Sequence, residues 1–532
     1  MKNNFGNVMK GAIILSGASF IAKILSAMYR IPFENMVGNL GFYVYQQVYP
    51  IYAIGMTFSL SGFPVFISKI IAEQDDIESK YQISKRIFDV LVVLAILCFL
   101  FLQLGSTQIA EAMGDIKLEV IIRSVSWMFL LMPFLSVGRG FYQGIFNMTP
   151  TAVSQVYEQL IRVIVIIGVA WYAVRHHWSI YKMGAWAMFG STLGGLVALL
   201  CFVGIFIRLF SRKSHKHSIK YRDLVKRLMT EGIMICLFTA LMVLLQLIDS
   251  FTIKNNLEIY GLSSIKASNI KGIYDRAQPL IQLGLVIGVS FSSTLLPSLT
   301  AAIEKKEKTT FENTASSILR ISLGIASAAT VGLLALLPEV NKLLFGDSEL
   351  SLVIGIYLLG IILMTVINSY SSILQSIDEY RVLLIGLGVA FLTKYILNSY
   401  LIGKFGIIGA SIATTASLLL AAITIILFSS IKLEILFRSD GYVLKLLLIS
   451  CIMGIVVKGL SILLGYLLGS SRLDVGIISL ICIPVGVFIF GILAIKFNLF
   501  TKEEYKYIES VWNVKNYITG QHHFLVNFAP II

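Results

Sequence analysis

The chain has 532 residues, of which 57% are hydrophobic and only 14% are charged, and its mean hydropathy is +0.84. A water-soluble protein of this length needs far more charge to cover its surface, so the composition excludes a soluble globular protein and indicates a polytopic membrane protein. The formal net charge of +14 is explained by Lys and Arg in cytoplasmic loops, which set the orientation of membrane spans. We therefore expect no nucleic-acid partner.

Fourteen apolar segments of the sequence are long enough to cross a membrane. They lie near residues 9–30, 42–68, 87–105, 119–145, 151–174, 184–208, 229–252, 274–301, 313–337, 351–376, 382–402, 405–430, 442–467 and 475–497. The first segment follows a short basic stretch without a signal-peptide cleavage site, so we expect it to stay as an anchor. The predicted inside loops 69–86, 211–227, 304–310 and 431–440 are rich in Lys and Arg, and only the outside loops 174–184 and 253–271 go against this trend. With an even number of spans, this alternation places both termini in the cytoplasm.

The two halves of this pattern resemble one another at a nearly constant offset. A shift of 233 residues places Gly55 on Gly288, Ser59 on Ser292 and Pro64 on Pro297, and a shift of 232 places Gln143 on Gln375 and Arg162 on Lys394. Parallel repeats of this kind are typical of transporters whose two lobes rock about a central site. Chance similarity between apolar helices is the alternative.

We therefore predict an all-α polytopic membrane protein with two pseudo-symmetric six-helix lobes and two additional C-terminal helices. The predicted parts are an N-terminal lobe at 1–210, a basic cytoplasmic linker at 211–227, a C-terminal lobe at 228–430, the two extra helices at 442–498 and a cytoplasmic tail at 499–532.

Several ionisable residues fall inside the predicted spans. Each costs about 2.5–3.5 kcal/mol there unless it faces a partner or a water-filled cavity. Those that we single out are seven basic residues and three acidic ones: Lys23, Arg30, Arg123, Arg139, Arg162, Arg276 and Lys394, and Glu158, Asp249 and Asp275. A cavity with this excess of positive charge attracts an anion.

Some of these charges also have a purely structural interpretation. Arg30, Arg123 and Asp249 lie near span ends, from which a side chain can reach the membrane interface. Glu158 and Arg162 are four residues apart and so are spaced to neutralise each other on one helix face.

Other charges are harder to explain structurally. Asp275 and Arg276 are adjacent, so they point to different faces and do not simply neutralise each other. Lys23 and Lys394 lie in the middle of spans, and we predict that both line a polar cavity.

Cysteine and histidine usage argues against metal chemistry. The five cysteines lie inside apolar segments without paired spacing, and the six histidines lie in loops or in the tail. We expect buried free thiols and neither a disulfide framework nor a metal site.

YDRAQPLIQLGLVIGVSFSSTLLPSL at 274–299 begins with Asp–Arg and ends in LLPSL. In both features it is similar to the eighth helix of the MurJ-type lipid II flippases. SFIAKILSAMYRIPF at 19–33 resembles their first helix, with Lys23 where the family often has a cavity arginine and Arg30 close to a second. FGIIGASIATTAS at 405–417 resembles the start of their twelfth helix. The family belongs to the multidrug, oligosaccharidyl-lipid and polysaccharide exporter superfamily, with the SpoVB-like polysaccharide transporters and the MATE-type multidrug exporters.

The resemblance implies a flippase, and not an enzyme, in the plasma membrane of a Gram-positive bacterium. Its cargo would be an undecaprenyl-pyrophosphate-linked cell-wall precursor, in the first place lipid II, moved to the outer leaflet by alternating access. Arg presents forked donors that suit phosphate oxygens. The expected pyrophosphate-binding residues are Lys23, Arg30 and Arg276, followed by Arg139 and Arg162.

Three alternatives stay open at this point. One is a flippase for another lipid-linked polysaccharide or for a teichoic-acid precursor, which shares the pyrophosphate. Another is a MATE-like cation-coupled drug exporter, which needs an acidic cavity. The third is a membrane glycosyltransferase, which needs acidic catalytic residues outside, whereas the loop 253–271 offers only Glu258.

The resemblance also bears on energy coupling. Some relatives bind sodium between helices 7, 11 and 12, and Asp249, Asn398 and Thr414 match that site. Lys394 stands where a further ligand is expected, and its ammonium would replace the ion. We therefore expect no cofactor; sodium coupling is one alternative, and the membrane potential is another driver.

Glu158 and Asp275 are predicted to line the cavity together with the basic residues.

The remaining expectations concern partners. The tail segment 501–518 mixes aromatic and charged residues, as in helices that lie on membrane lipids. A docking site for cell-wall synthesis proteins is the alternative.

Overall fold

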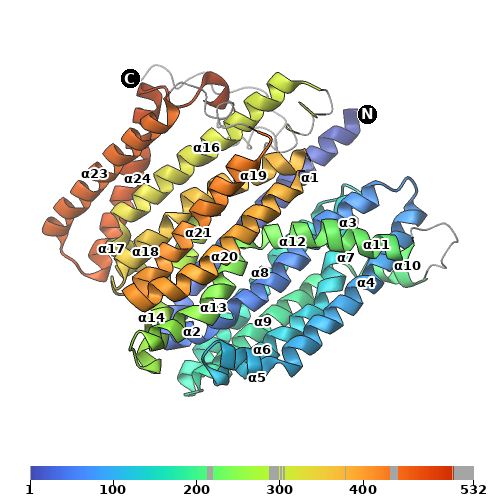
Figure 1. Cartoon of the computed structure of the whole chain (residues 1–532), viewed down its shortest axis with the longest axis horizontal. Coiled ribbons are helices and arrows are strands. Elements are labelled where there is room, and N and C mark those ends of the chain that lie inside the picture. The colour runs from blue at the N-terminus through green and yellow to red at the C-terminus, as the bar shows by residue number, and fades with distance from the viewer. Residues whose placement is uncertain are drawn as a thin grey trace.

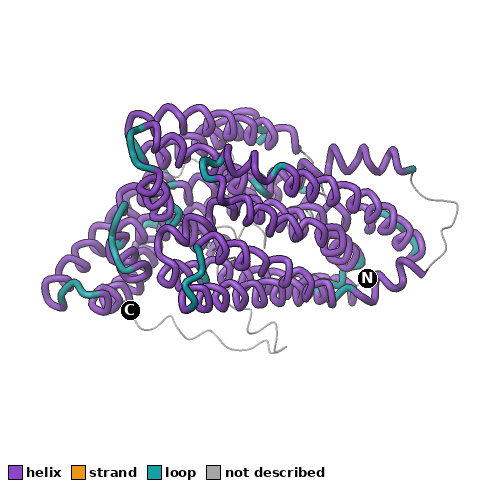
Figure 2. The backbone as a smooth tube through the Cα atoms, turned by 90° about the horizontal axis from the view of Figure 1, so that it is seen from below, coloured by secondary structure: helices purple, strands orange, loops and turns teal. Residues whose placement is uncertain are grey.

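The structure is a computed structural model of residues 1–532. It describes the whole chain except residues 1, 212–219, 287–298, 300–301, 304–305, 378, 432–440, 506 and 508–532. Within the described residues the protein is helical and contains no strand, and Figure 2 shows short loops joining the ends of long helices. Apolar runs form helices because every backbone polar group must find its partner inside the segment when the solvent is lipid.

The first half of the chain forms a bundle of helices that are interrupted by short 3-10 and π segments. These elements are α1 (Lys2–Met28), α2 (Arg30–Thr57), η1 (Phe58–Gly62), α3 (Phe63–Ala72), α4 (Ile77–Leu104), α5 (Ser106–Ala112), η2 (Ile116–Leu118), α6 (Glu119–Ser126), η3 (Trp127–Leu131), α7 (Met132–Gly144), α8 (Thr149–Arg175), α9 (Ile180–Leu200) and α10 (Val203–Ser211).

The second half forms a second bundle and ends in a helical hairpin, α23–α24. Its elements are α11 (Tyr221–Arg227), η4 (Leu228–Gly232), α12 (Ile233–Thr239), α13 (Leu241–Ile259), α14 (Ser264–Tyr274), α16 (Lys308–Ala335), α17 (Leu337–Phe345), α18 (Ser351–Leu358), α19 (Gly360–Ser376), α20 (Tyr380–Phe405), α21 (Ile407–Phe428), α23 (Tyr442–Leu468) and α24 (Arg472–Lys496). After a turn at Asp275 and Arg276, residues 277–286 are helical again.

The described helices confirm the prediction of an all-helical polytopic membrane fold. Eleven of them are long and apolar enough to cross a membrane, or up to twelve if the bent pair Tyr221–Thr239 and Leu241–Ile259 is one span. One of the eleven, Gly17–Ala72, has 56 residues and turns at Gly38, whose φ of 69° is left-handed. The predicted span near 274–301 lies partly outside the described residues, so the count of fourteen stays a prediction.

The two halves lie side by side in Figure 1, the first in blue to cyan and the second mainly in yellow to red. In the first half α8 packs along α9, and in the second half α20 packs along α21. Arg162 lies on α8 and Lys394 on α20, at equivalent places in the repeat. Gly288, Ser292 and Pro297, the other second-half members of the 233-residue shift, lie outside the described residues.

One span joins the two halves through a bend. The helix axis turns by 69° at the break between Thr239 and Leu241. Before the break, α12 packs on α3 and η1 of the first half, and after it, α13 packs on α20 of the second half. The boundaries 1–210 and 228–430 of the predicted lobes stay predictions.

The halves meet where α2 passes α13 and α14 (Figure 1). We call this end of the bundle the closed end. Gly272 of α14 lies so close to the carbonyl oxygen of Asn39 that a Cβ at Gly272 would overlap it, and a Cβ at Gly114 would overlap the Asn255 side chain. These two glycines therefore allow the close approach of the halves.

Candidate functional site

A polar stripe on α1 faces α8. Ser19 Oγ donates to Gln155 Oε1 at 2.8 Å, and Arg162 Nη2 donates to Ser26 Oγ at 3.3 Å. Ser19, Lys23 and Ser26 share one face of α1 because of the 3.6-residue period, and Arg30 is the first residue of α2. We call Lys23, Arg30 and the facing Arg162 of α8 the cation cluster. Lys23 is the exposed member.

The two arginines of the cation cluster are buried without counter-ions. Arg30 is 0% exposed, and none of its guanidinium nitrogens has a hydrogen-bond partner among the described residues. Arg162 is 1% exposed, and its Nε and Nη1 are also without such partners. Both cations lie over tyrosine rings: Arg30 is 4.3 Å from the centroid of Tyr49, and Arg162 is 4.6 Å from Tyr52 and 5.1 Å from Tyr29.

This arrangement is energetically unusual. Burying an unpaired guanidinium costs several kcal/mol, and a cation–π contact returns only about 0.5–2 kcal/mol. Buried cations that lack a counter-ion mark a candidate site for an anionic ligand.

Arg139 differs from the cation cluster because each of its three guanidinium nitrogens has a hydrogen-bond partner. Its Nη2 pairs with Glu158 Oε2, its Nη1 donates to the carbonyl oxygen of Ser59 at 3.0 Å, and its Nε donates to Ser154 Oγ at 3.2 Å. Glu158 therefore neutralises Arg139, and the interpretation that Glu158 neutralises Arg162 is wrong. The predicted role of Arg139 in binding pyrophosphate stays a prediction, but in this conformation its charge is paired with Glu158.

Arg276 bridges the two halves at the closed end. Its Nε and Nη2 donate to Glu34 Oε1 at 3.1 and 2.8 Å, and its Nη1 donates to Asp347 Oδ1 at 2.7 Å. Its Nη2 also donates to Asn39 Oδ1 at 2.7 Å. Glu34 and Asn39 belong to the first half and Asp347 to the second, so this guanidinium fastens the halves together; we call the arrangement the Arg276 clasp. A role of Arg276 in binding pyrophosphate also stays a prediction, and the clasp would have to open first.

Asp275 takes a different partner from Arg276. Lys271 Nζ lies 2.5 and 2.6 Å from the two carboxylate oxygens of Asp275, and both side chains are buried.

Asp347 lies in the loop between α17 and α18. Burial alone would raise its pKa, but hydrogen bonds from Arg276 and from the Glu349 backbone N–H hold the pKa of Asp347 below its usual value.

Lys394 lies in a buried cage of oxygen atoms between α13, α20 and α21. Its Nζ is 2.6 Å from Asp249 Oδ1, 3.1 Å from Asn398 Oδ1 and 3.3 Å from the carbonyl oxygen of Ala410, and it also donates to Thr414 Oγ1. Lys394 is 0% exposed, so in this conformation it lies in a packed network and does not line an open cavity. The four predicted coupling residues Asp249, Lys394, Asn398 and Thr414 are brought together.

Several site residues were missed by the sequence analysis. Glu34 and Asp347 bind Arg276 from distant positions, and no short-range pattern connects them. Two signals were present in the sequence: Lys271 and Asp275 are spaced i, i+4, and Tyr45, Tyr49 and Tyr52 recur on one face of a helix.

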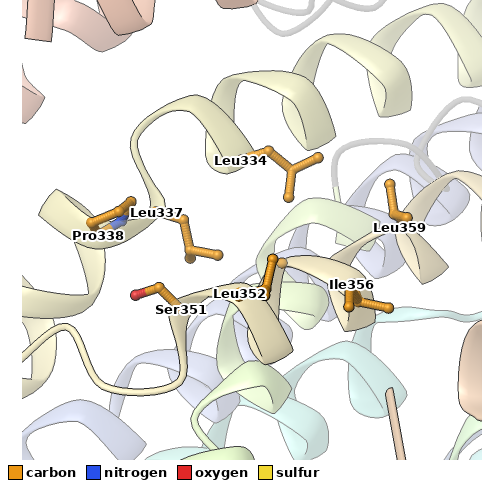
Figure 3. A pocket seen from close by; sticks show the side chains of 8 residues that line it. Leu334, Leu337, Pro338, Ser351, Leu352, Ile356 and Leu359 are labelled. Carbon is orange, nitrogen blue, oxygen red and sulfur yellow. The ribbon is translucent and has the colours of Figure 1, made fainter. Parts of the chain in front are cut away.

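A separate apolar crevice of about 330 Å³ opens between α16, α17 and α18 (Figure 3). It is lined by Leu334, Leu337, Pro338, Ser351, Leu352, Gly355, Ile356 and Leu359. None of these lining residues is charged, so the crevice is not the candidate anion site. Among the described residues, no group of three or more His, Cys, Asp or Glu side chains is placed to hold a metal ion.

An all-helical bundle of apolar spans that buries several cations is typical of a multi-pass transporter. Residues 8–303 match the family described as "Polysaccharide biosynthesis protein". The chain is 34% identical to the uncharacterized membrane protein YabM of Bacillus subtilis (strain 168), over 93% of this chain and 94% of that protein. It therefore belongs to the polysaccharide biosynthesis protein family.

Further comparisons fit this assignment. The lipid II flippase MurJ of Bacillus subtilis (strain 168) is 24% identical, over 90% of this chain and 93% of that protein. The structure of a lipid II flippase MurJ in an inward closed conformation has a TM-score of 0.66 at 15% identity and covers 91% of this chain and 99% of its own. The fold is thus that of the MurJ-like transporters, as the sequence predicted.

Proposed function

We propose that the protein is a flippase for an undecaprenyl-pyrophosphate-linked cell-wall precursor, in the first place lipid II, and that it is not an enzyme. It would lie in the bacterial plasma membrane with both termini in the cytoplasm. The closed end is then the outer end, because the loops that carry Gly114 and Asp347 fall on the predicted outer side. The cargo would be moved from the inner to the outer leaflet.

The observation that supports this proposal most strongly is the pair of buried guanidiniums, Arg30 and Arg162, without carboxylate partners. A pyrophosphate supplies the missing negative charge, and Arg donors match its oxygens with two parallel hydrogen bonds. Lys23, exposed on the polar face of α1, would meet the head group first. A site of this sign disfavours a cationic drug as cargo, which argues against a MATE-like exporter.

The closed end supports alternating access as the mechanism. Arg276 holds Glu34 and Asp347 together across the two halves, so this end must separate before a cargo can leave through it. The bound pyrophosphate brings negative charge into a bundle whose first half carries uncompensated positive charge. Its release would leave that charge unbalanced, and the inside-negative potential would then favour return of the empty carrier to the inward-facing state.

Energy coupling through a resident ammonium fits the contacts of Lys394. We propose that this side chain takes the place of an alkali metal ion among the oxygens of Asp249, Asn398, Ala410 and Thr414. Transport would then need no sodium and would be driven by the membrane potential. No bound cofactor is required for these steps.

Complementation tests the proposed function. The essential lipid II flippase of a bacterial host is depleted, and this chain is expressed as wild type, Arg30→Gln, Arg162→Gln or Arg123→Gln, with membrane levels measured for each. Arg123 is the matched control, because it is half-exposed and paired with Glu119 at 2.7 Å. We expect growth with the wild type and Arg123→Gln and no growth with the other two variants.

The possible outcomes test the identity of the cargo and the position of the binding site separately. A well-expressed wild type that does not restore growth would contradict lipid II as the cargo. The alternatives are then other lipid-linked polysaccharide or teichoic-acid precursors, which carry the same pyrophosphate. Growth with both Arg30→Gln and Arg162→Gln would contradict the cation cluster as the binding site.

A further inference from the structure

The C-terminal hairpin α23–α24 is attached to α17 by polar contacts along its length. Lys458 Nζ lies 2.9 Å from Glu339 Oε1, and Ser461 Oγ donates to the same oxygen at 2.7 Å. Lys342 Nζ donates to the carbonyl oxygen of Ser470 in the turn of the hairpin. The position of α17 is therefore fixed by the hairpin as well as by the second half.

Arg472, the first residue of α24, holds the C-terminal end of α17. Its Nε donates to the carbonyl oxygen of Leu343 at 2.9 Å, and its Nη2 donates to that of Leu344 at 2.9 Å. These carbonyls belong to the last turn of a helix, where they have no partner within the helix and where a cation is favoured by the helix dipole. The helix ends at Phe345, and the next residue, Gly346, has a φ of 91° that turns the chain into Asp347.

The same guanidinium also reaches the first half of the chain. Arg472 Nη2 donates to Asn35 Oδ1 at 2.7 Å, across 437 residues of sequence. Asn35 Nδ2 in turn donates to the carbonyl oxygen of Leu344 at 2.7 Å. Asn35 is adjacent to Glu34 in the chain, and Leu344 lies three residues before Asp347, so this junction borders the Arg276 clasp on both sides.

We propose that Arg472 is a positioning residue for closure of this end and that the hairpin α23–α24 is the third component of the closing contact. Arg472 fixes the end of α17 and so presents Asp347 to Arg276. It also ties the hairpin directly to α2 through Asn35. When the halves separate, the hairpin and α17 stay together, and Arg472 loses only Asn35. The inference rests on the opening of this end in the proposed function, but it can be tested without any cargo.

The test measures the separation of the two halves in the purified full-length chain. The five cysteines are replaced, and spin labels are placed at Ile116→Cys in the first half and Ile265→Cys in the second, where the native side chains are 53% and 73% exposed. Arg472→Ala should raise the ratio of open to closed protein about tenfold, as expected for losing hydrogen bonds to a charged group. Arg472→Lys should give an intermediate shift, because one ammonium cannot replace the guanidinium fork.

Two controls make the result specific. Leu473→Ala, at an 81% exposed neighbouring side chain, should leave the distance distribution unchanged. In an Arg276→Gln background the clasp is already broken, so adding Arg472→Ala should have an effect less than half as large as in the wild type. A distribution identical to wild type in Arg472→Ala, or full additivity with Arg276→Gln, would overturn the proposal. Neither result depends on whether the chain transports lipid II.

Discussion

Arg139 and Arg162 are both buried arginines of the first half, yet they should respond in opposite ways to the same substitution. Arg139 is paired with Glu158, which is only 2% exposed. Replacing Arg139 by Met leaves that carboxylate buried and unpaired, which costs about 3–5 kcal/mol. Arg139→Met should therefore strongly reduce the free energy of unfolding.

Arg162→Met removes a charge that has no counter-ion. The variant is relieved of a desolvation cost of several kcal/mol and loses two cation–π contacts, worth together about 1–4 kcal/mol. Its hydrogen bond to Ser26, at 3.3 Å, is long and contributes little. The free energy of unfolding should stay the same or rise by up to about 2 kcal/mol, while the restoration of growth in the depleted host is lost.

Thermal unfolding of the two purified variants checks this contrast. Arg139→Met should melt well below the wild type, and the double variant Arg139→Met/Glu158→Met should recover most of the loss, because no unpaired charge remains. Arg162→Met should melt at or above the wild-type temperature. Equal destabilisation by Arg162→Met and Arg139→Met would refute the conclusion that Arg162 lacks a counter-ion.

Three further predictions concern the coupling cage and the closed end. Lys394→Ala should create a cation site from the oxygens around Asp249. Sodium chloride should therefore raise the melting temperature of this variant, and choline chloride should not. An equal rise with sodium chloride in the wild type would contradict the conclusion that the Lys394 ammonium occupies this site. Gly272→Ala should separate the spin labels at residues 116 and 265, because its Cβ would overlap the Asn39 carbonyl oxygen, whereas Gly403→Ala, which has open space around it, should not. In a Glu34→Gln background, the distance between the labels should stay constant from about pH 8 to 5. The lowered pKa of Asp347 keeps its carboxylate charged until the pH falls below the usual value of ~3.9. An increase in this distance between pH 7 and 5 would contradict the prediction.

The fold was predictable because the solvent is lipid. Long apolar segments must be helices in a bilayer, whatever their neighbours are, so the helices near 151–174 and 382–402 were expected correctly from hydropathy. The interruptions were harder to predict. The bend between Thr239 and Leu241 of 69° follows from α12 packing on the first half, a tertiary contact that no local pattern records.

The sequence allowed us to predict which charged residues of the site are buried, but not which of them form ion pairs with each other. The cost of burying charge indicated Arg30, Arg139, Arg162 and Arg276, and all four are buried. Sequence spacing could not show that Glu158 binds Arg139, because the two lie on different helices. The Arg276 clasp joins residues 242 and 71 positions apart in the chain, and only the folded structure brings them together.

The central claim is that the cation cluster binds the pyrophosphate of a lipid-linked sugar and carries it across the membrane. Its most direct test is flipping of a labelled undecaprenyl-pyrophosphate-linked sugar in vesicles that contain only the purified protein. We predict flipping by the wild type and by Arg123→Gln, and none by Arg30→Gln/Arg162→Gln reconstituted at the same density. Flipping by that double variant at the wild-type rate would contradict the claim.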